Sequence, residues 1–108
     1  MNKRLEKIEK ILNEKKAENI EVIDLTKKEY IVDYVVIATT LNSKHAFALL
    51  NYLKNDLKPL GEEFLRVDDD DNWTIIDLGD VFIHLMSEEY RKKYTIEEFL
   101  SELETRNY

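Results

Sequence analysis

The chain has 108 residues, of which 44% are hydrophobic, 36% are charged and none is cysteine. This length favours one domain, residues 1–108, that folds without a metal or a disulfide. The absence of cysteine excludes disulfide frameworks, thiolate zinc sites and cysteine nucleophiles. The net charge of −7 argues against direct nucleic-acid recognition, because Lys and Arg supply the affinity for phosphate. A basic protein would suit this acidic chain better as a partner.

No apolar run approaches the roughly 20 residues that cross a bilayer. The first residues alternate in charge and include Glu6 and Glu9, unlike a signal or transit peptide. We therefore expect a cytoplasmic protein without membrane contacts.

The first part of the chain predicts one helix and two strands. Residues 2–17 carry an apolar stripe at helical spacing, with Lys and Glu elsewhere. Residues 20–25 alternate weakly between apolar and polar, which indicates a strand. Residues 34–39 are nearly all apolar and β-branched, which is typical of a central strand covered on both faces.

The middle of the chain predicts a second helix and an edge strand. The helix is expected to begin at Asn42 or Ser43 and to end near Leu57, before a proline and a glycine. Residues 62–67 predict a short edge strand. The four aspartates of residues 68–71 predict a solvated loop.

Residues 73–78 and 81–86 predict a β-hairpin, because Gly79 and Asp80 form a two-residue turn that begins with glycine. A turn of this length fixes which residues face each other. One face of the hairpin is then almost wholly apolar and is expected to lie under helices. Its cross-strand pairs are Leu78–Val81, Ile76–Ile83 and Thr74–Leu85.

The other face of the hairpin mixes large apolar side chains with one carboxylate and one imidazole. Its residues are Trp73, Ile75, Asp77, Phe82, His84 and Met86. Such a mixture is typical of a protein-binding patch, in which Trp is often an anchor. The alternative is that another helix covers this face and that all six residues are core. Asp77 and His84 favour exposure, because a buried charge needs a partner.

Two helices are expected at the end of the chain. Ser87 begins a short one, and a second follows Thr95 with Ile96, Phe99, Leu100 and Leu103 as one apolar face. The order of elements is helix, strand, strand, helix, three strands and helices. This order predicts a single α/β domain with a mixed sheet of about five strands and helices packed on it.

Four segments carry motifs that occur together in one known family. Residues 73–86 fit W-x-x-x-D-x-G-D-x-x-x-H, and residues 33–39 fit D-[aromatic]-x-x-I-[small]-T. Residues 42–45 fit S-S-[RK]-H with Asn42 in the first position, and Tyr94 fits a tyrosine that precedes the last helix. In this order the motifs resemble those of the ribosomal silencing factors, the RsfS or Iojap family.

The resemblance runs over residues 20–103, which would be the family core after an N-terminal helix over residues 1–17. The sequence departs from the family pattern near Arg66 and Val67, where the family usually has Glu-Gly, and at Thr40, where it has Gly. These departures affect the segment before the hairpin more than the hairpin itself.

The resemblance implies a mixed α/β fold with nucleotidyltransferase-like topology and a role without catalysis or cofactor. Members bind the large ribosomal subunit through its basic protein fourteen and so obstruct the small subunit. The positions that would lie in or beside the docking surface are Trp73, Asp77, His84 and Met86, with Asp80 and Tyr94 as weaker assignments.

Two other classes of function remain open from the residues. One is a magnesium-dependent, nucleotidyltransferase-like enzyme with Asp77 and Asp80 as ligands, although no glycine-rich phosphate loop is present. The other is a homodimerisation domain, in which the second face of the hairpin pairs with its own copy across a two-fold axis.

Overall fold

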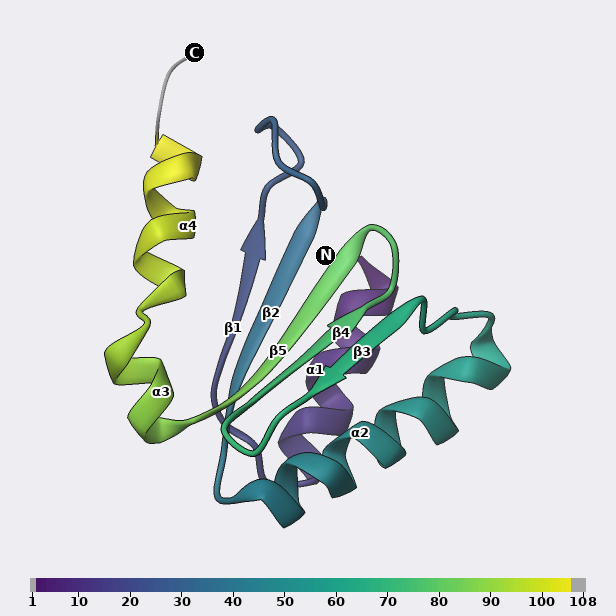
Figure 1. The fold of residues 1–108 in the computed structure, drawn as a ribbon. Helices are drawn as coiled ribbons and strands as arrows, with labels where there is room; N and C mark the ends of the chain where they lie inside the picture. The colour runs from purple at the N-terminus through teal and green to yellow at the C-terminus, as the bar shows by residue number, and fades with distance from the viewer. Residues whose placement is uncertain (1, 106–108) are drawn as a thin grey trace.

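The computed structural model describes residues 2–105, and it describes side chains as far as residue 100. The strands drawn in Figure 1 are β1 Glu18–Asp24, β2 Tyr34–Thr40, β3 Arg66–Asp69, β4 Trp73–Asp77 and β5 Val81–Ser87. The helices are α1 Lys3–Glu14, α2 Ser43–Leu57, the 3-10 turn η1 Lys58–Leu60, α3 Glu88–Lys93 and α4 Ile96–Thr105.

The strands form one mixed sheet in the order β1-β2-β5-β4-β3. The central pair, β2 and β5, is parallel, and the other three pairs are antiparallel. Strands β1 and β3 are therefore the two edges. The predicted α/β fold with a mixed sheet of about five strands is confirmed, while its likeness to nucleotidyltransferases stays a prediction.

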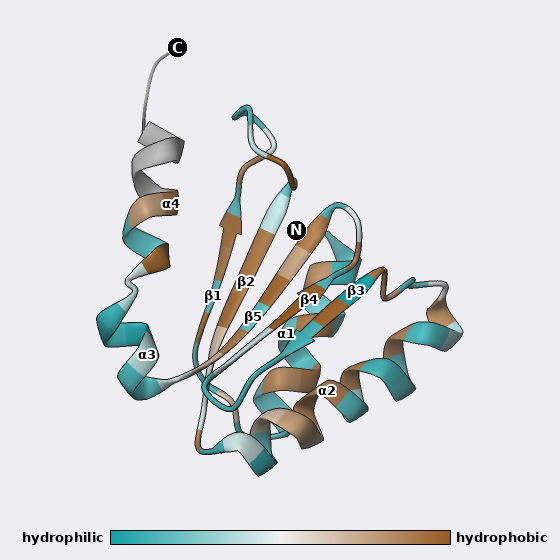
Figure 2. Ribbon diagram, in the orientation of Figure 1, coloured by the Kyte–Doolittle hydropathy of each residue, from teal (hydrophilic) through white to brown (hydrophobic). Residues whose placement is uncertain are grey.

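Helices α1 and α2 supply the main core, which covers one face of the sheet. Their predicted apolar stripes are buried against alternate residues of β2, β4 and β5. Figure 2 shows these apolar residues as brown bands along the central strands and along the inner sides of both helices. Burial of each large side chain stabilises the fold by about 1.5–3 kcal/mol. The helical members are Leu5, Ile8, Ile11, Leu12, Leu49, Leu50, Leu53 and Leu57.

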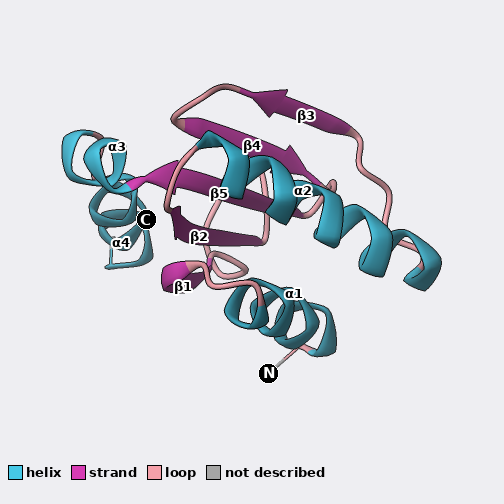
Figure 3. Ribbon diagram, turned by 90° about the horizontal axis from the view of Figure 1, so that it is seen from below, coloured by secondary structure: helices cyan, strands magenta, loops and turns pink. Residues whose placement is uncertain are grey.

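Helices α3 and α4 form a separate layer, away from α1 and α2, as Figures 1 and 3 show. They contact β1, β2 and β5. A second core cluster lies there and includes Ile37 of β2, Met86 of β5 and Leu100 of α4. Phe99 instead is 56% exposed, so the predicted apolar face of the last helix is only partly correct, and the side chain of Leu103 lies outside the described residues.

Two elements have a boundary that differs from the prediction by more than two residues. The first helix ends at Glu14, because Lys16 adopts a left-handed conformation with φ 69° and turns the chain into β1. The edge strand runs over Arg66–Asp69 instead of residues 62–67. Arg4 of α1 binds the carboxylate of Glu62 at 2.6 Å, which holds the preceding segment against α1. Because β3 ends at Asp69, the first half of the predicted aspartate loop belongs to the sheet.

Helices long and apolar enough to cross a bilayer do not occur in the part of the chain that the structure describes.

Candidate functional site

The hairpin has the predicted register. Trp73 lies opposite Met86, Ile75 opposite His84, and Asp77 opposite Phe82. The N–H of Leu78 donates to the carbonyl of Val81 at 2.9 Å, and Gly79 has φ +98°. A residue with a Cβ would be strained at that φ, which explains why the turn begins with glycine.

Aromatic rings from the hairpin, from α3 and from the residue that follows α3 meet in one row across the second face. The ring centroids of Phe82 and His84 are 6.4 Å apart, and those of His84 and Trp73 are 5.9 Å apart. Trp73 then contacts Tyr94 at 5.5 Å, and Tyr94 contacts Tyr90 at 5.3 Å. We call these five residues the aromatic row. It brings together four of the predicted site residues and adds Tyr90, which the sequence analysis missed.

A hydrogen bond fixes the centre of the aromatic row. The indole Nε1 of Trp73 donates to Nδ1 of His84 at 3.0 Å. Since Nδ1 accepts, the proton of the neutral imidazole lies on Nε2. Burial lowers the pKa of His84 to about 4, so the ring is neutral at pH 7. The predicted interface histidine thus orients the predicted anchor.

Met86 is completely buried, so the prediction that it stands on an open surface is wrong. It belongs to the second core cluster with Leu100 of α4. The physical reason is that α3 and α4 fold back over β1, β2 and the end of β5 that carries Met86. Trp73, Ile75 and Phe82 are only half-buried on the same face.

The two aspartates of the hairpin have different partners. The carboxylate of Asp77 accepts the N–H of Gly79 at 2.8 Å, which is the local structural role of such a residue. Asp80 forms a bidentate pair with Arg4 of α1, at 2.6 and 2.9 Å, and this bond lowers the pKa of Asp80. No cluster of three or more metal-binding side chains occurs among the described residues.

The layer of α3 and α4 is fixed by a buried cation that the sequence analysis missed. Arg91 is 8% exposed, and its guanidinium donates to the carbonyl of Asn19 and, at 3.0 Å, to the hydroxyl of Thr39. Glu21 and Glu97 each lie 3.7 Å from it. The only available signal was an arginine within a short helix, which cannot distinguish a surface cation from a buried one.

Comparisons with known proteins agree with the motifs. The family model described as ribosomal silencing factor during starvation, RsfS, matches residues 1–107. The ribosomal silencing factor RsfS of Bacillus subtilis is 26% identical over 87 residues, which cover 79% of this chain and 74% of that protein. A mouse protein named mitochondrial assembly of ribosomal large subunit protein 1 is 30% identical over 92 residues, which cover 81% of this chain but 40% of the mouse protein.

Solved structures agree as well. The crystal structure of a Chromobacterium violaceum protein has a TM-score of 0.84 and 25% identity, with 94% of this chain and 88% of that chain covered. A Bacillus halodurans protein has a TM-score of 0.76 and 26% identity, with 91% and 94% covered. With the family model matched along nearly the whole sequence, the chain belongs to the RsfS family of ribosomal silencing factors.

Proposed function

We propose that this protein binds the large ribosomal subunit through its aromatic row and blocks association with the small subunit. The target would be the basic large-subunit protein fourteen, and repression of translation would come from steric occlusion without chemistry. The observation that carries the proposal is the aromatic row itself, set on a part of the sheet that the layer of α3 and α4 leaves half-exposed. We define the docking face as Trp73, Ile75, Asp77, Phe82, His84 and Tyr94.

The docking face has the composition of an interface core. Trp73 and Tyr94 combine large apolar rings with a polar atom, which is the kind of side chain that dominates binding energy at protein interfaces. The bond from Trp73 to His84 holds the indole in one orientation before any partner arrives, so little conformational entropy is lost on binding.

The negative charge of this chain supports a basic partner. The exposed aspartates of β3 and of the turn after it border the docking face beside Trp73 and Ile75. The whole chain carries −7, so a basic protein surface would be attracted at long range, and added salt would slow the encounter.

The test is co-sedimentation of the protein with purified large subunits. Trp73→Ala combined with Asp77→Lys is expected to reduce binding at least tenfold, because it removes the central anchor and reverses a charge. Cross-linking of the wild-type complex would then name the contacted subunit protein. Leu60→Ala is a matched control, since Leu60 is 67% exposed but lies on η1. Undiminished sedimentation of the double variant, with an unchanged circular dichroism spectrum, would refute the docking face.

A homodimer of the free protein remains part of the proposal, because the half-exposed rings of the docking face would also suit a second copy. Light scattering at several concentrations measures it, and Trp73→Ala is expected to shift a dimer toward monomer. Cytoplasmic location and absence of catalysis stay predictions. Relatives are named as silencing factors or ribosome-assembly proteins rather than enzymes.

A further inference from the structure

Strand β3 leaves one side of its backbone without a strand partner. Within the described residues 2–105, it is the last strand of the sheet and pairs only with β4. In an antiparallel ladder, alternate residues direct their N–H and C=O groups toward opposite sides. The bond from Leu78 to Val81 fixes this alternation, so Thr74 and Ile76 direct their backbone groups toward β5.

The same alternation determines the direction of the backbone N–H and C=O groups of β3. Val67 lies opposite Ile76, and Asp69 lies opposite Thr74. Because those two β4 residues bond to β5, the N–H and C=O groups of Val67 and Asp69 must direct away from the sheet. The open edge thus presents two donors and two acceptors to a further strand.

A hollow lies on each side of this edge. On the α2 side, a hollow of about 320 Å³ is lined by Phe47, Lys44, Ser43 and the aspartates of residues 69–71. On the side of the docking face, a hollow of about 310 Å³ is lined by Trp73, Ile75 and the aspartates of residues 68–70. We call them the Phe47 hollow and the Trp73 hollow. Each therefore combines an aromatic wall with three carboxylates.

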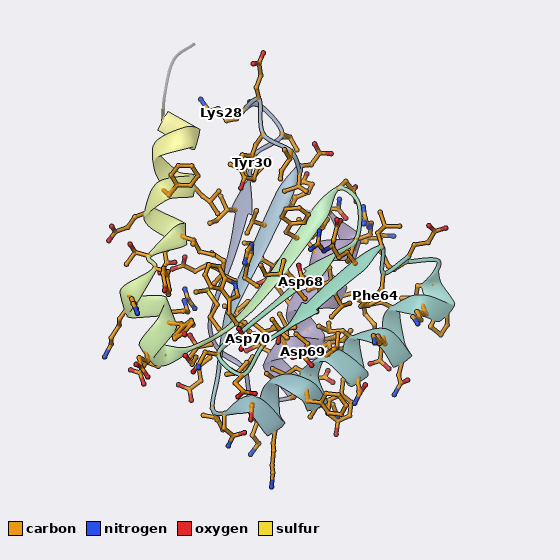
Figure 4. All side chains as sticks on the ribbon, in the orientation of Figure 1. Lys28, Tyr30, Phe64, Asp68, Asp69 and Asp70 are labelled. Carbon is orange, nitrogen blue, oxygen red and sulfur yellow. The ribbon has the colours of Figure 1, made fainter. Side chains whose placement is uncertain are left out.

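The carboxylates along β3 indicate which charge a segment that binds at this edge would carry. Asp68, Asp69, Asp70 and Asp71 are all exposed, and Figure 4 shows the first three along β3 and the turn that follows. Arg66 pairs with Asp68 at 3.1 Å, and Lys44 lies in the Phe47 hollow, so two cations face four anions. Two copies of this edge would place aspartates opposite each other, which destabilises a strand pair. A second copy is therefore a poor occupant, and a basic one is favoured.

We propose that the β3 edge accepts an extended, basic segment of the partner protein as a sixth strand of the sheet. Its backbone would bond to Val67 and Asp69. Since alternate side chains of a strand lie on opposite faces, its Lys and Arg residues would enter the Phe47 hollow and the Trp73 hollow in turn. This inference rests on the proposed function, because it gives the partner of the docking face a second, adjacent contact by strand addition.

The test compares two substitutions at one position. Asp69→Ala removes the carboxylate and keeps the N–H, whereas Asp69→Pro removes both. Proline is tolerated at an edge residue whose N–H faces solvent, so both variants are expected to fold. In sedimentation with large subunits, we expect Asp69→Pro to bind at least tenfold more weakly than Asp69→Ala. Equal affinities of the two variants would overturn the strand addition.

Two further measurements keep the outcomes distinct. If Asp69→Pro proves unfolded by circular dichroism, amide hydrogen exchange on the wild-type protein replaces it. Exchange at Val67 and Asp69 is expected to slow at least tenfold in the presence of subunits, and unchanged exchange would overturn the inference. Trp73→Ala reports separately on the proposed function. If Trp73→Ala leaves binding unchanged, the docking face is contradicted. If Trp73→Ala weakens binding but Asp69→Pro binds as tightly as Asp69→Ala, only the sixth strand is contradicted.

Discussion

Strands β4 and β5 send alternate side chains to two faces of the sheet, and the two faces have different fates. On the face under α1 and α2, Ile76, Ile83 and Leu85 are completely buried. On the opposite face, Ile75 and His84 are half-buried, although they occupy neighbouring positions on the same strands. The pleat of the hairpin distributes residues equally to both faces, so the difference comes from the helices that cover them.

The comparison shows why hydrophobicity alone does not identify a core. The second face is nearly as apolar as the first, yet α3 and α4 cover β1, β2 and only part of β5. At the boundary, Met86 is buried while Trp73, directly opposite it on β4, retains exposed surface. Cover by a helix, and not the type of side chain, separates packing residues from candidate docking residues.

Truncation of one aliphatic residue on each face tests the difference in packing most directly. Leu85→Ala is expected to lower the free energy of unfolding by about 3 kcal/mol, because it leaves a cavity in a fully packed core. Ile75→Ala on the other face is expected to cost under about 1 kcal/mol. Urea denaturation measures both. Losses of equal size would mean that the two faces are equally well packed.

The second test weakens the attachment of α3 and α4 to the sheet. Arg91→Ala is expected to lower the free energy of unfolding by about 2 kcal/mol, because the carbonyl of Asn19 and the hydroxyl of Thr39 lose a buried charged donor. Trp73 is the only tryptophan, so its fluorescence should shift to longer wavelength as Tyr94 moves away. Lys92→Ala is the control, since Lys92 makes only an exposed pair with Glu88. An unshifted emission maximum for Arg91→Ala would contradict this anchoring role.

The third test concerns the titration of His84. Burial lowers its pKa from 6.5 to about 4, so below pH 6.5 the unfolded chain binds a proton that the folded protein does not. Stability is therefore expected to fall as pH decreases from 6.5 toward 4, by at most about 1.4 kcal/mol per pH unit. The substitution His84→Gln should remove this contribution to the change of stability with pH. Denaturation midpoints of both proteins across this range measure it, and parallel profiles would contradict the assignment.

Much of the candidate site could be predicted from the sequence. The two-residue turn at Gly79 and Asp80 determines every cross-strand pair of the hairpin, so the second face was assigned correctly in composition. Long-range contacts could not be predicted. Arg4, which precedes Asp80 by 76 residues, binds that carboxylate only because α1 packs near the turn. Arg91 is similar, since its hydrogen-bond partners Asn19 and Thr39 lie on β1 and β2.

Local sequence patterns specify the elements and the alternation within them, because helical spacing, turn residues and β-branched runs act over a few neighbouring positions. They also specify the family, through motifs in a fixed order. Only the packing of the folded chain buries Met86 and places β3 between two hollows. Those properties depend on which helix covers which strand, and that choice is made by the packing of the whole chain.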